Sequence, residues 1–274
     1  YEKSSGQDTL HPLSLRVIDQ FFCISLCSIP LILGFIIPVG VLLNFIFKGL
    51  AVINYLAIIQ ATITSIVLSI SAAFIVMFFA TLMIVVTFYK SNTLQRILTF
   101  LASCGYAFPG TILSVGIVVF IGWLNDIIYF HLSYLTGGII VLFFAYLIRF
   151  LAVGNGAIKS GIVRIHPNIV DSSLTMGVSF YRIIIKIIIP LIYTNMIVGG
   201  ILVFVDILKE LPMTLLLRPF NFETLATYVY QYASDEMLEE SSLAAIIIVL
   251  IGLGPIVYLN STLKRLSQKK SNQI

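Results

Sequence analysis

The sequence predicts an all-α membrane protein, and three observations lead to this prediction. Of the 274 residues, 59% are hydrophobic and only 10% are charged, whereas a soluble domain carries about 25% charged residues. The mean hydropathy is +1.06. Apolar runs of about 20 residues, the length that an α-helix needs to cross a bilayer, recur along the chain. A soluble enzyme, a nucleic-acid-binding protein and a disordered protein are therefore excluded, because a soluble core of this size could not bury so much apolar surface.

Six apolar runs are long enough to be transmembrane helices. They are residues 21–47, 59–89, 97–124, 132–150, 183–205 and 243–260. The second run has no charged residue from Gly49 to Tyr89, so a hairpin of two shorter spans is the alternative to one long helix. Polar residues between Asn54 and Ser65 favour an outer loop followed by one long helix.

The distribution of lysine and arginine predicts which ends of the spans face the cytoplasm. With six spans and both termini inside, 13 of the 16 Lys and Arg residues fall in inner segments, Arg149 among them at the end of the fourth span. A hairpin in the second run would reverse every later segment and abolish this bias. We therefore expect residues 1–20 and the basic tail, 263–274, to be cytoplasmic, and the body of the chain, 21–262, to lie in the lipid bilayer.

The inner loop between the fourth and fifth spans, residues 151–182, contains a predicted short helix. Pro167 indicates where this helix begins, and Asn168 would be its N-cap. Asp171 would then lie near the positive end of the helix dipole. Gly177 predicts the end of the helix, because glycine adopts the left-handed cap conformation. A partner protein could hold such an element and move it, and an interfacial helix lying on lipid is the alternative.

The outer loop, residues 206–242, keeps aromatic and leucine residues among its charges, and a short amphipathic helix is expected from Thr224 to Tyr232. Three acidic residues of this loop are candidates for binding a cation: Asp206, Glu210 and Glu223. Ordinary ion pairs with Lys209 or Arg218 are the alternative for these carboxylates.

No pattern typical of catalysis or of a bound cofactor is present. The three histidines, His11, His131 and His166, are far apart in sequence and lack the spacing of a zinc protease. The glycines around Gly105 and Gly110 lack the lysine of a phosphate-binding loop. We expect no catalytic residue, no cofactor and no resident metal ion.

Two runs of residues resemble conserved motifs of one family, the permeases of ABC importers. The run DSSLTMGVSFYRIIIKIIIP, residues 171–190, resembles the EAA motif: Asp171, Ser172 and Ser173 match its triplet, and Gly177 and Pro190 match its glycine and final proline. Two alanines of that motif are replaced by serine and one leucine by isoleucine. The run GYAFPGTILSVG, residues 105–116, resembles a second motif of the superfamily, and the outer segment 205–236 resembles the ferric-iron subfamily.

The resemblance implies a six-span permease bundle of the MetI-like type, with a cytoplasmic EAA coupling loop, in the bacterial inner membrane. It also implies several partners: a periplasmic iron-binding protein, cytoplasmic ABC ATPase subunits that hydrolyse ATP, and a second permease half or subunit. The chain itself would be no enzyme, and it would be the C-terminal half of a fused permease or one subunit of a split pair. Permeases for thiamine, polyamines or sulfate share this fold, so the substrate stays open. Half of a secondary transporter, which would need no ATPase, is a further alternative.

Overall fold

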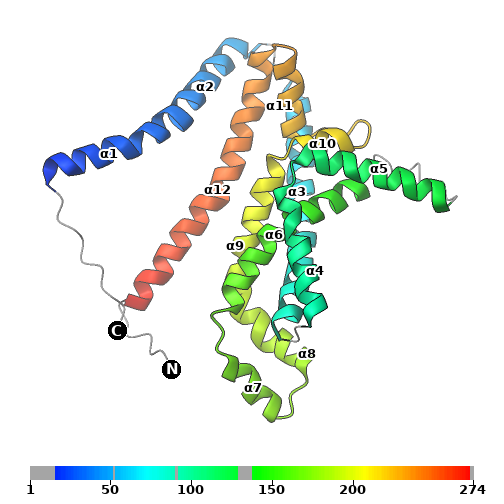
Figure 1. Ribbon diagram of the computed structural model, residues 1–274. Helices are drawn as coiled ribbons and strands as arrows, with labels where there is room; N and C mark the ends of the chain where they lie inside the picture. Colours follow the sequence, from blue (N-terminus) through cyan, green and yellow to red (C-terminus); the bar gives the residue numbers. More distant parts are fainter. Residues whose placement is uncertain (1–15, 52, 90–91, 129–137, 272–274) are drawn as a thin grey trace.

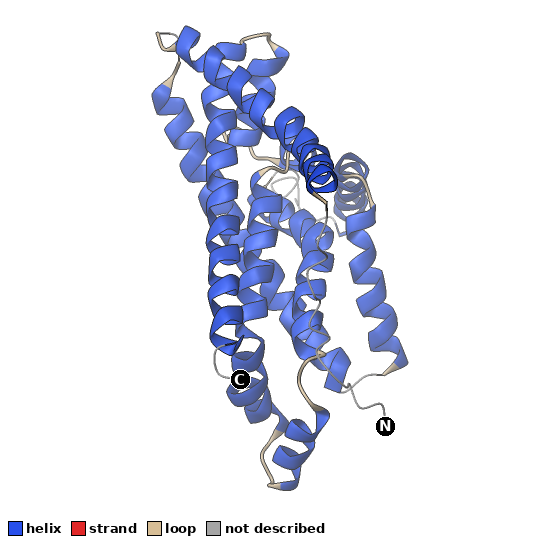
Figure 2. Cartoon of the chain, turned by 90° about the vertical axis from the view of Figure 1, so that its left-hand side faces the viewer, coloured by secondary structure: helices blue, strands red, loops and turns tan. Residues whose placement is uncertain are grey.

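The computed structural model describes residues 16–51, 53–89, 92–128 and 138–271. Within these ranges all regular secondary structure is helical, which confirms the predicted fold class (Figures 1 and 2). Most helices run along the long axis of the molecule (Figure 2). Helices in this arrangement suit a bundle that crosses a bilayer, because each helix satisfies its backbone hydrogen bonds internally.

In the described part of the chain, five helical rods are long and apolar enough to cross a membrane. They are α1–η1–α2 (Val17–Leu31, the π-helical turn Ile32–Ile36, Ile37–Gly49), α3 (Tyr55–Tyr89), α6 (Ile139–Ile162), α8–η4–α9 (Phe180–Ile183, the π-helical turn Ile184–Ile188, Ile189–Leu208) and α12 (Leu238–Ser271). The second expected span is one uninterrupted helix, α3, and not a hairpin.

The third expected span, residues 97–124, differs from the prediction of a single straight helix. It consists of α4 (Thr93–Ser103), the 3-10 turn η2 (Cys104–Ala107) and α5 (Gly110–Ile128), with a bend of 118° between the two helical parts. Pro109 explains the break, because the residue before a proline is pushed out of the helical region and Phe108 is extended, with φ −81° and ψ 137°. Counting this bent pair as one span gives six candidate spans among the described residues.

Two predicted boundaries also differ. The fourth expected span, 132–150, begins before the described residues resume at 138, and its helix α6 continues to Ile162. The connection that was expected at 151–182 is therefore only 163–179. Helix α12 continues to Ser271, so the described part of the expected tail is helical.

Three short helices complete the fold: α7 (Pro167–Thr175), α10 (Pro212–Leu217) and α11 (Leu225–Ser234). Helix α11 confirms the short helix expected after Thr224. The Thr224 hydroxyl accepts a hydrogen bond from the Thr227 backbone N–H, and the Thr227 side chain accepts one from the Thr224 N–H. The Leu225 N–H donates to the buried Ser65 hydroxyl at 2.7 Å, which fastens α11 to α3.

The main core lies where α3, α6 and α9 pack against one another. Small residues allow this close approach, as is common between helices in membranes. An added Cβ at Gly154 would lie 2.9 Å from the Ala80 Cβ, and one at Gly199 would lie 2.7 Å from the Ala157 Cβ. Bulky side chains such as Tyr146 and Ile158 are fully buried around these contacts.

The α1–η1–α2 rod leans away from the bundle and meets α12 only at one end (Figure 1). At that end Gly49 lies against Glu239, and a Cβ on Gly49 would overlap the Glu239 side chain. The side chains of α1 are not buried. Phe21 is 73% exposed there, and Phe74 on α3 is 74% exposed. Aromatic side chains exposed to this extent along the rods form a surface suited to lipid or to another membrane helix.

Candidate functional site

Helix α7 projects from one end of the bundle, beyond the ends of α6 and α8 (Figure 1). Its N-cap is His166, whose Nδ1 accepts a hydrogen bond from the Asn168 N–H at 3.4 Å. The predicted N-cap Asn168 is therefore wrong. Pro167 accounts for the difference, because a proline fits the first helical position. The N-cap is then the residue before the proline, His166. Asp171 consequently lies in the second turn of α7, not the first.

The end of α7 confirms the predicted stop at Gly177. Gly177 has φ +77°, the left-handed conformation that glycine adopts without steric cost. Its N–H donates to the Leu174 carbonyl at 2.9 Å, and the Val178 N–H donates to the Ser173 carbonyl at 3.2 Å. This pair of hydrogen bonds is the Schellman motif, and it turns the chain sharply from α7 into α8.

The exposed surface of α7 mixes polar and apolar side chains. Asp171 and Ser172 are exposed, and Ser173 is half-buried. Both serine hydroxyls donate to the Ile169 carbonyl, at 3.2 Å for Ser172 and 2.7 Å for Ser173. Met176, just beyond the helix, is 81% exposed. An unpartnered surface of this composition is suited to contact with another protein.

The chain after the Gly177 turn is one continuous helical rod, α8–η4–α9, that enters the bundle. Pro190 is exposed in the first turn of α9, two residues after the π-helical turn η4 ends. Pro38 has the same position after η1 in the first rod. A π-helical turn widens the helix, and such turns account for helix bends near functional sites. The rod is thus unbroken from Phe180, just after the Gly177 turn, to Leu208 in the bundle.

Two of the three acidic candidates form the ion pairs that were expected as the alternative. Asp206 lies 3.0 Å from the Lys209 Nζ, and the Glu223 carboxylate lies 3.5 Å from the Arg218 guanidinium. Arg218 also donates to the Thr227 hydroxyl at 3.1 Å and so ties α11 to the preceding loop. Asp206 and Glu223 therefore each form an ion pair with a different basic residue.

The third acidic candidate, Glu210, is buried and paired with an arginine from the middle of α6. Its Oε2 lies 3.7 Å from Arg149 Nε, and the two side chains are 8% and 19% exposed. Its Oε1 also accepts the Met213 N–H at 3.3 Å. The placement of Arg149 at an inner flank is corrected: α6 extends 13 residues further, to Ile162, so that Arg149 lies inside the bundle.

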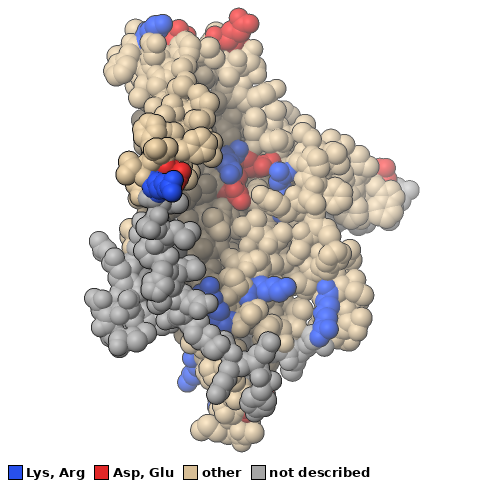
Figure 3. Space-filling view, turned by 60° about the vertical axis from the view of Figure 1, so that its left-hand side comes forward, with Lys and Arg blue, Asp and Glu red and all other residues tan. Residues whose placement is uncertain are grey.

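The break between α4 and α5 packs directly on this charge pair. A Cβ on Gly110, the first residue of α5, would overlap the Arg149 guanidinium and lie 2.9 Å from Glu210 Oε1. Behind the pair, the Tyr146 and Thr214 hydroxyls share a hydrogen bond, and the Thr214 hydroxyl also bonds the Glu210 carbonyl. In the space-filling view, acidic and basic side chains adjoin in a recess at mid-height (Figure 3).

The sequence analysis did not predict that Arg149 lies inside the bundle and pairs with Glu210. One signal was available: the residues that follow it, from Leu151 onward, are also mostly apolar, so the apolar run does not end at Phe150. A charged residue inside such a run is expected to have a partner in the bundle interior.

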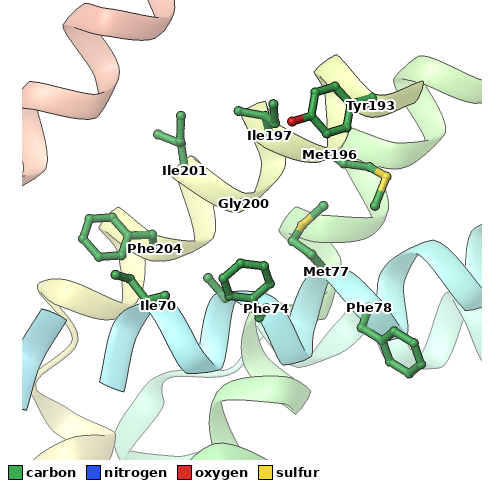
Figure 4. Close-up of a pocket in the computed structure, with 11 residues that line it drawn as sticks. Ile70, Phe74, Met77, Phe78, Tyr193, Met196, Ile197, Gly200, Ile201 and Phe204 are labelled. Atoms are coloured by element: carbon green, nitrogen blue, oxygen red, sulfur yellow. The ribbon is translucent and has the colours of Figure 1, made fainter. Parts of the chain in front are cut away.

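An apolar groove of about 530 Å³ lies between α3 and α9. Phe74 and Met77 extend from α3 toward Met196 and Phe204 of α9 (Figure 4). Its walls offer almost no polar atom to a charged substrate. Across the described ranges, no three His, Cys, Asp or Glu side chains lie close enough together to hold a metal ion.

Comparison with known proteins identifies the family. The model of the "binding-protein-dependent transport system inner membrane component" family matches residues 78–270, which is more than half of the chain. The chain belongs to this family. It is therefore the permease component of an ABC importer, and its matched region includes both α7 and the Arg149–Glu210 pair.

One curated relative of this permease is the Fe(3+)-transport system permease protein FbpB 2 of Haemophilus influenzae, 25% identical over 155 residues. These residues are 56% of this chain and 29% of the relative, so the chain spans well under two thirds of the relative's length.

Solved structures show that the permease shares the fold of other importers. A bacterial alginate ABC transporter, crystallised with an alginate-bound periplasmic protein, superposes with a TM-score of 0.72 at 15% identity, over 90% of this chain and 95% of that one. An inward-facing MetNI methionine transporter superposes with a TM-score of 0.50 at 16% identity, over 74% and 96% of the two chains. At such identities these likenesses concern the fold alone.

Proposed function

We propose that this permease forms one half of the membrane path of a ferric-iron importer, to which a periplasmic binding protein delivers the iron. The family membership carries the transport function, and the ferric-permease relative supports iron as the substrate. That relative is roughly twice as long as this chain, since the same 155 residues are 56% of one and 29% of the other. The difference in length supports a second permease half or subunit as a partner.

The proposed contact for a separate cytoplasmic ATPase is α7 with its Gly177 turn. Asp171, Ser172 and Ser173 lie on this helix, which projects beyond the bundle and leads into α9 through an unbroken rod. ATP hydrolysis would take place in that ATPase. Both chain termini and α7 would face the cytoplasm of a bacterial cell, in agreement with the excess of Lys and Arg in the segments at that side.

The transport cycle follows from two arrangements of the bundle. Closure of the ATPase would pull α7, and the α8–η4–α9 rod would carry this movement into the core beside α3 and α6. A ligand shifts such an equilibrium only by its difference in affinity for the two states. A change from mostly inward-facing to mostly outward-facing needs about 5.5 kcal/mol of such a difference, which ATP bound between two ATPase subunits would supply.

Ferric iron would pass the acidic residues of the outer mouth without a resident site. Asp206 and Glu223 are both partly exposed and each is held by one cation, so a trivalent cation could exchange with Lys209 or Arg218. Glu210 is buried with Arg149, and we assign it a structural role at the α4–α5 break.

A transport assay tests this proposal. Cells that express the permease with its neighbouring ATPase and binding-protein genes would take up radiolabelled ferric iron, and an ATPase variant unable to hydrolyse ATP would abolish the uptake. Parallel assays with thiamine, spermidine and sulfate compare the other substrates of this superfamily. Uptake of one of these in place of iron would contradict the substrate, and uptake that follows a proton gradient without the ATPase would contradict the mechanism.

A further inference from the structure

A second pocket, of about 640 Å³, lies between α3, α4 and α6, away from the Arg149–Glu210 pair. It is located where α3 ends, α4 begins and α6 ends, which is the end of the bundle that carries α7 (Figure 1). The residues contributed by α4 follow helical spacing, with Arg96, Thr99 and Ser103 on one face. The residues from α6 do the same, with Asn155 and Lys159 one turn apart. The pocket is therefore bounded by helix faces and not by loops.

The lining of this pocket combines two cations with apolar and aromatic surface. Arg96 and Lys159 are both exposed, and none of the described residues that line the pocket is acidic. Phe88, Phe100 and Ile84 supply the apolar part of the wall. The net charge of the wall is therefore positive.

The cations and the other polar side chains occupy different depths. Lys159 lies in the last turn of α6 and Arg96 near the start of α4, so both are at the end of the pocket nearest α7. Asn155 and Ser103 lie further into the bundle and share a hydrogen bond of 3.2 Å. Phe100 is 70% exposed on the outer wall. A charge at the surface followed by apolar wall matches the order of groups in a phospholipid.

One buried polar atom in the pocket has no partner. Asn155 is 4% exposed, and its amide nitrogen donates to Ser103, yet its Oδ1 has no hydrogen bond. Buried polar atoms in folded proteins are nearly always satisfied by protein or by a bound molecule. A water molecule held beneath the occupant would satisfy this oxygen.

We propose that this pocket binds an anionic phospholipid from the leaflet on the α7 side, with its phosphate between Arg96 and Lys159 and an acyl chain along Phe88 and Phe100. Basic pockets between transmembrane helices at this level are suited to such headgroups. The depth order of the lining favours a lipid over a free anion, because a soluble phosphate would gain nothing from the aromatic wall. This site depends on the bilayer setting and not on ferric iron as the substrate.

The test measures binding of phosphatidylglycerol to the purified permease complex in phosphatidylcholine nanodiscs, by native mass spectrometry across a titration. Removal of each cation should weaken binding roughly fivefold, as expected for about 1 kcal/mol per basic residue at a membrane surface. The R96Q/K159Q double variant should therefore lose most of the bound phosphatidylglycerol. The charge-preserving R96K/K159R variant should retain it, and this variant controls for folding.

Two further arms distinguish the alternatives. Arg182 is an exposed cation at the same end of the molecule that does not line the pocket, so R182Q should leave binding unchanged. Inorganic phosphate at millimolar concentration should not displace the lipid. Equal lipid retention by R96Q/K159Q and the parent protein would overturn the proposal, and so would displacement by phosphate alone, which would indicate a free-anion site.

Discussion

Glycines determine how closely the chain can approach itself at the points that shape this permease. Gly105 lies in the turn before the α4–α5 break, and a Cβ there would overlap the Ile148 backbone carbonyl of α6. Backbone atoms cannot move aside as a flexible side chain does. Gly116, within α5, has no atom within 4 Å of an added Cβ. A larger side chain is therefore expected to fit at Gly116 but not at Gly105, although both glycines belong to the same sequence run.

Substitution of Gly105 by alanine is expected to destabilise the permease by about 1–3 kcal/mol, the usual cost of overpacking a close contact. Thermal unfolding of the purified protein in detergent measures the effect. Gly116→Ala is the matched control, and it should be neutral or slightly stabilising because alanine is the better helix former. Equal melting temperatures for the two variants would show that η2 does not pack on α6 as described.

The Arg149–Glu210 pair gives a second prediction at this scale. Glu210→Gln keeps an oxygen for the Met213 N–H but leaves Arg149 without its counter-charge. The variant should lose up to about 3–5 kcal/mol of stability, the range measured when one member of a buried pair is removed. The R149M/E210Q double variant should recover much of this loss.

Asp206→Asn serves as the control for the charge pair, because the pairing of Asp206 with Lys209 is largely exposed and such pairs contribute about 0–1 kcal/mol. If Glu210→Gln unfolds at the same temperature as Asp206→Asn, the buried pair does not stabilise the bundle.

Among the secondary-structure elements, α7 is the one with the clearest link from sequence to function. Its start at Pro167 and its stop at Gly177 both follow from backbone chemistry, so the sequence could predict them. The N-cap could not be assigned in the same way, because His166 is a weak cap by residue type and acts here only through its Nδ1 contact with Asn168. Local chemistry thus predicts the helix to within two residues at its start.

The bend at Pro109 was less accessible to sequence reasoning. Pro30 lies inside α1 and Pro255 inside α12 without ending either helix. A proline in an apolar run therefore does not decide whether the run breaks. The break at Pro109 also depends on Gly105 and Gly110, which allow tertiary contacts with Ile148 and Arg149. Those partners are distant in sequence, as Arg149 is from Glu210, and apolar run length contains no information about them.

The turn at Gly177 predicts a specific effect on coupling. Space around Gly177 is open, so only its left-handed backbone restricts substitution. Gly177→Val should strain or rearrange the turn at a cost of about 1–2 kcal/mol, while Gly177→Asn should be tolerated because asparagine also adopts this conformation. ATP hydrolysis and substrate uptake, measured together in proteoliposomes, report the coupling.

The valine variant should insert normally and hydrolyse ATP with reduced uptake, and the asparagine variant should behave as the parent protein. Unimpaired uptake by Gly177→Val would contradict a coupling role for the turn.

Considered as a whole molecule, the permease has two ends of different chemistry. Helix α7 and the basic pocket lie at one end, while α11 and the contact between Gly49 and Glu239 lie at the other (Figure 1). The exposed apolar residues of the long rods lie between them. This order is expected for a protein that crosses a bilayer, and the positions of the apolar runs and of Lys and Arg along the sequence were enough to predict it.

Labelling with a membrane-impermeant maleimide tests the orientation of these ends. The native cysteines, Cys23, Cys27 and Cys104, are first replaced by alanine. Ser172→Cys on α7 should react only in everted vesicles, and Tyr230→Cys on α11 only in intact spheroplasts, because both positions are exposed at opposite ends. Reaction of both variants from the same side would refute the proposed topology.

The most direct test of the central claim is site-specific photo-crosslinking from position 176 in the assembled transporter, because Met176 is 81% exposed at the end of α7. A crosslinker at Ile256, which is 42% exposed on α12, is the control within the membrane. We predict an adduct with the ATPase from position 176 alone, with a yield that changes when ATP is added. Adducts with phospholipid only, in a complex that contains the ATPase, would contradict the assignment of α7 as the coupling element.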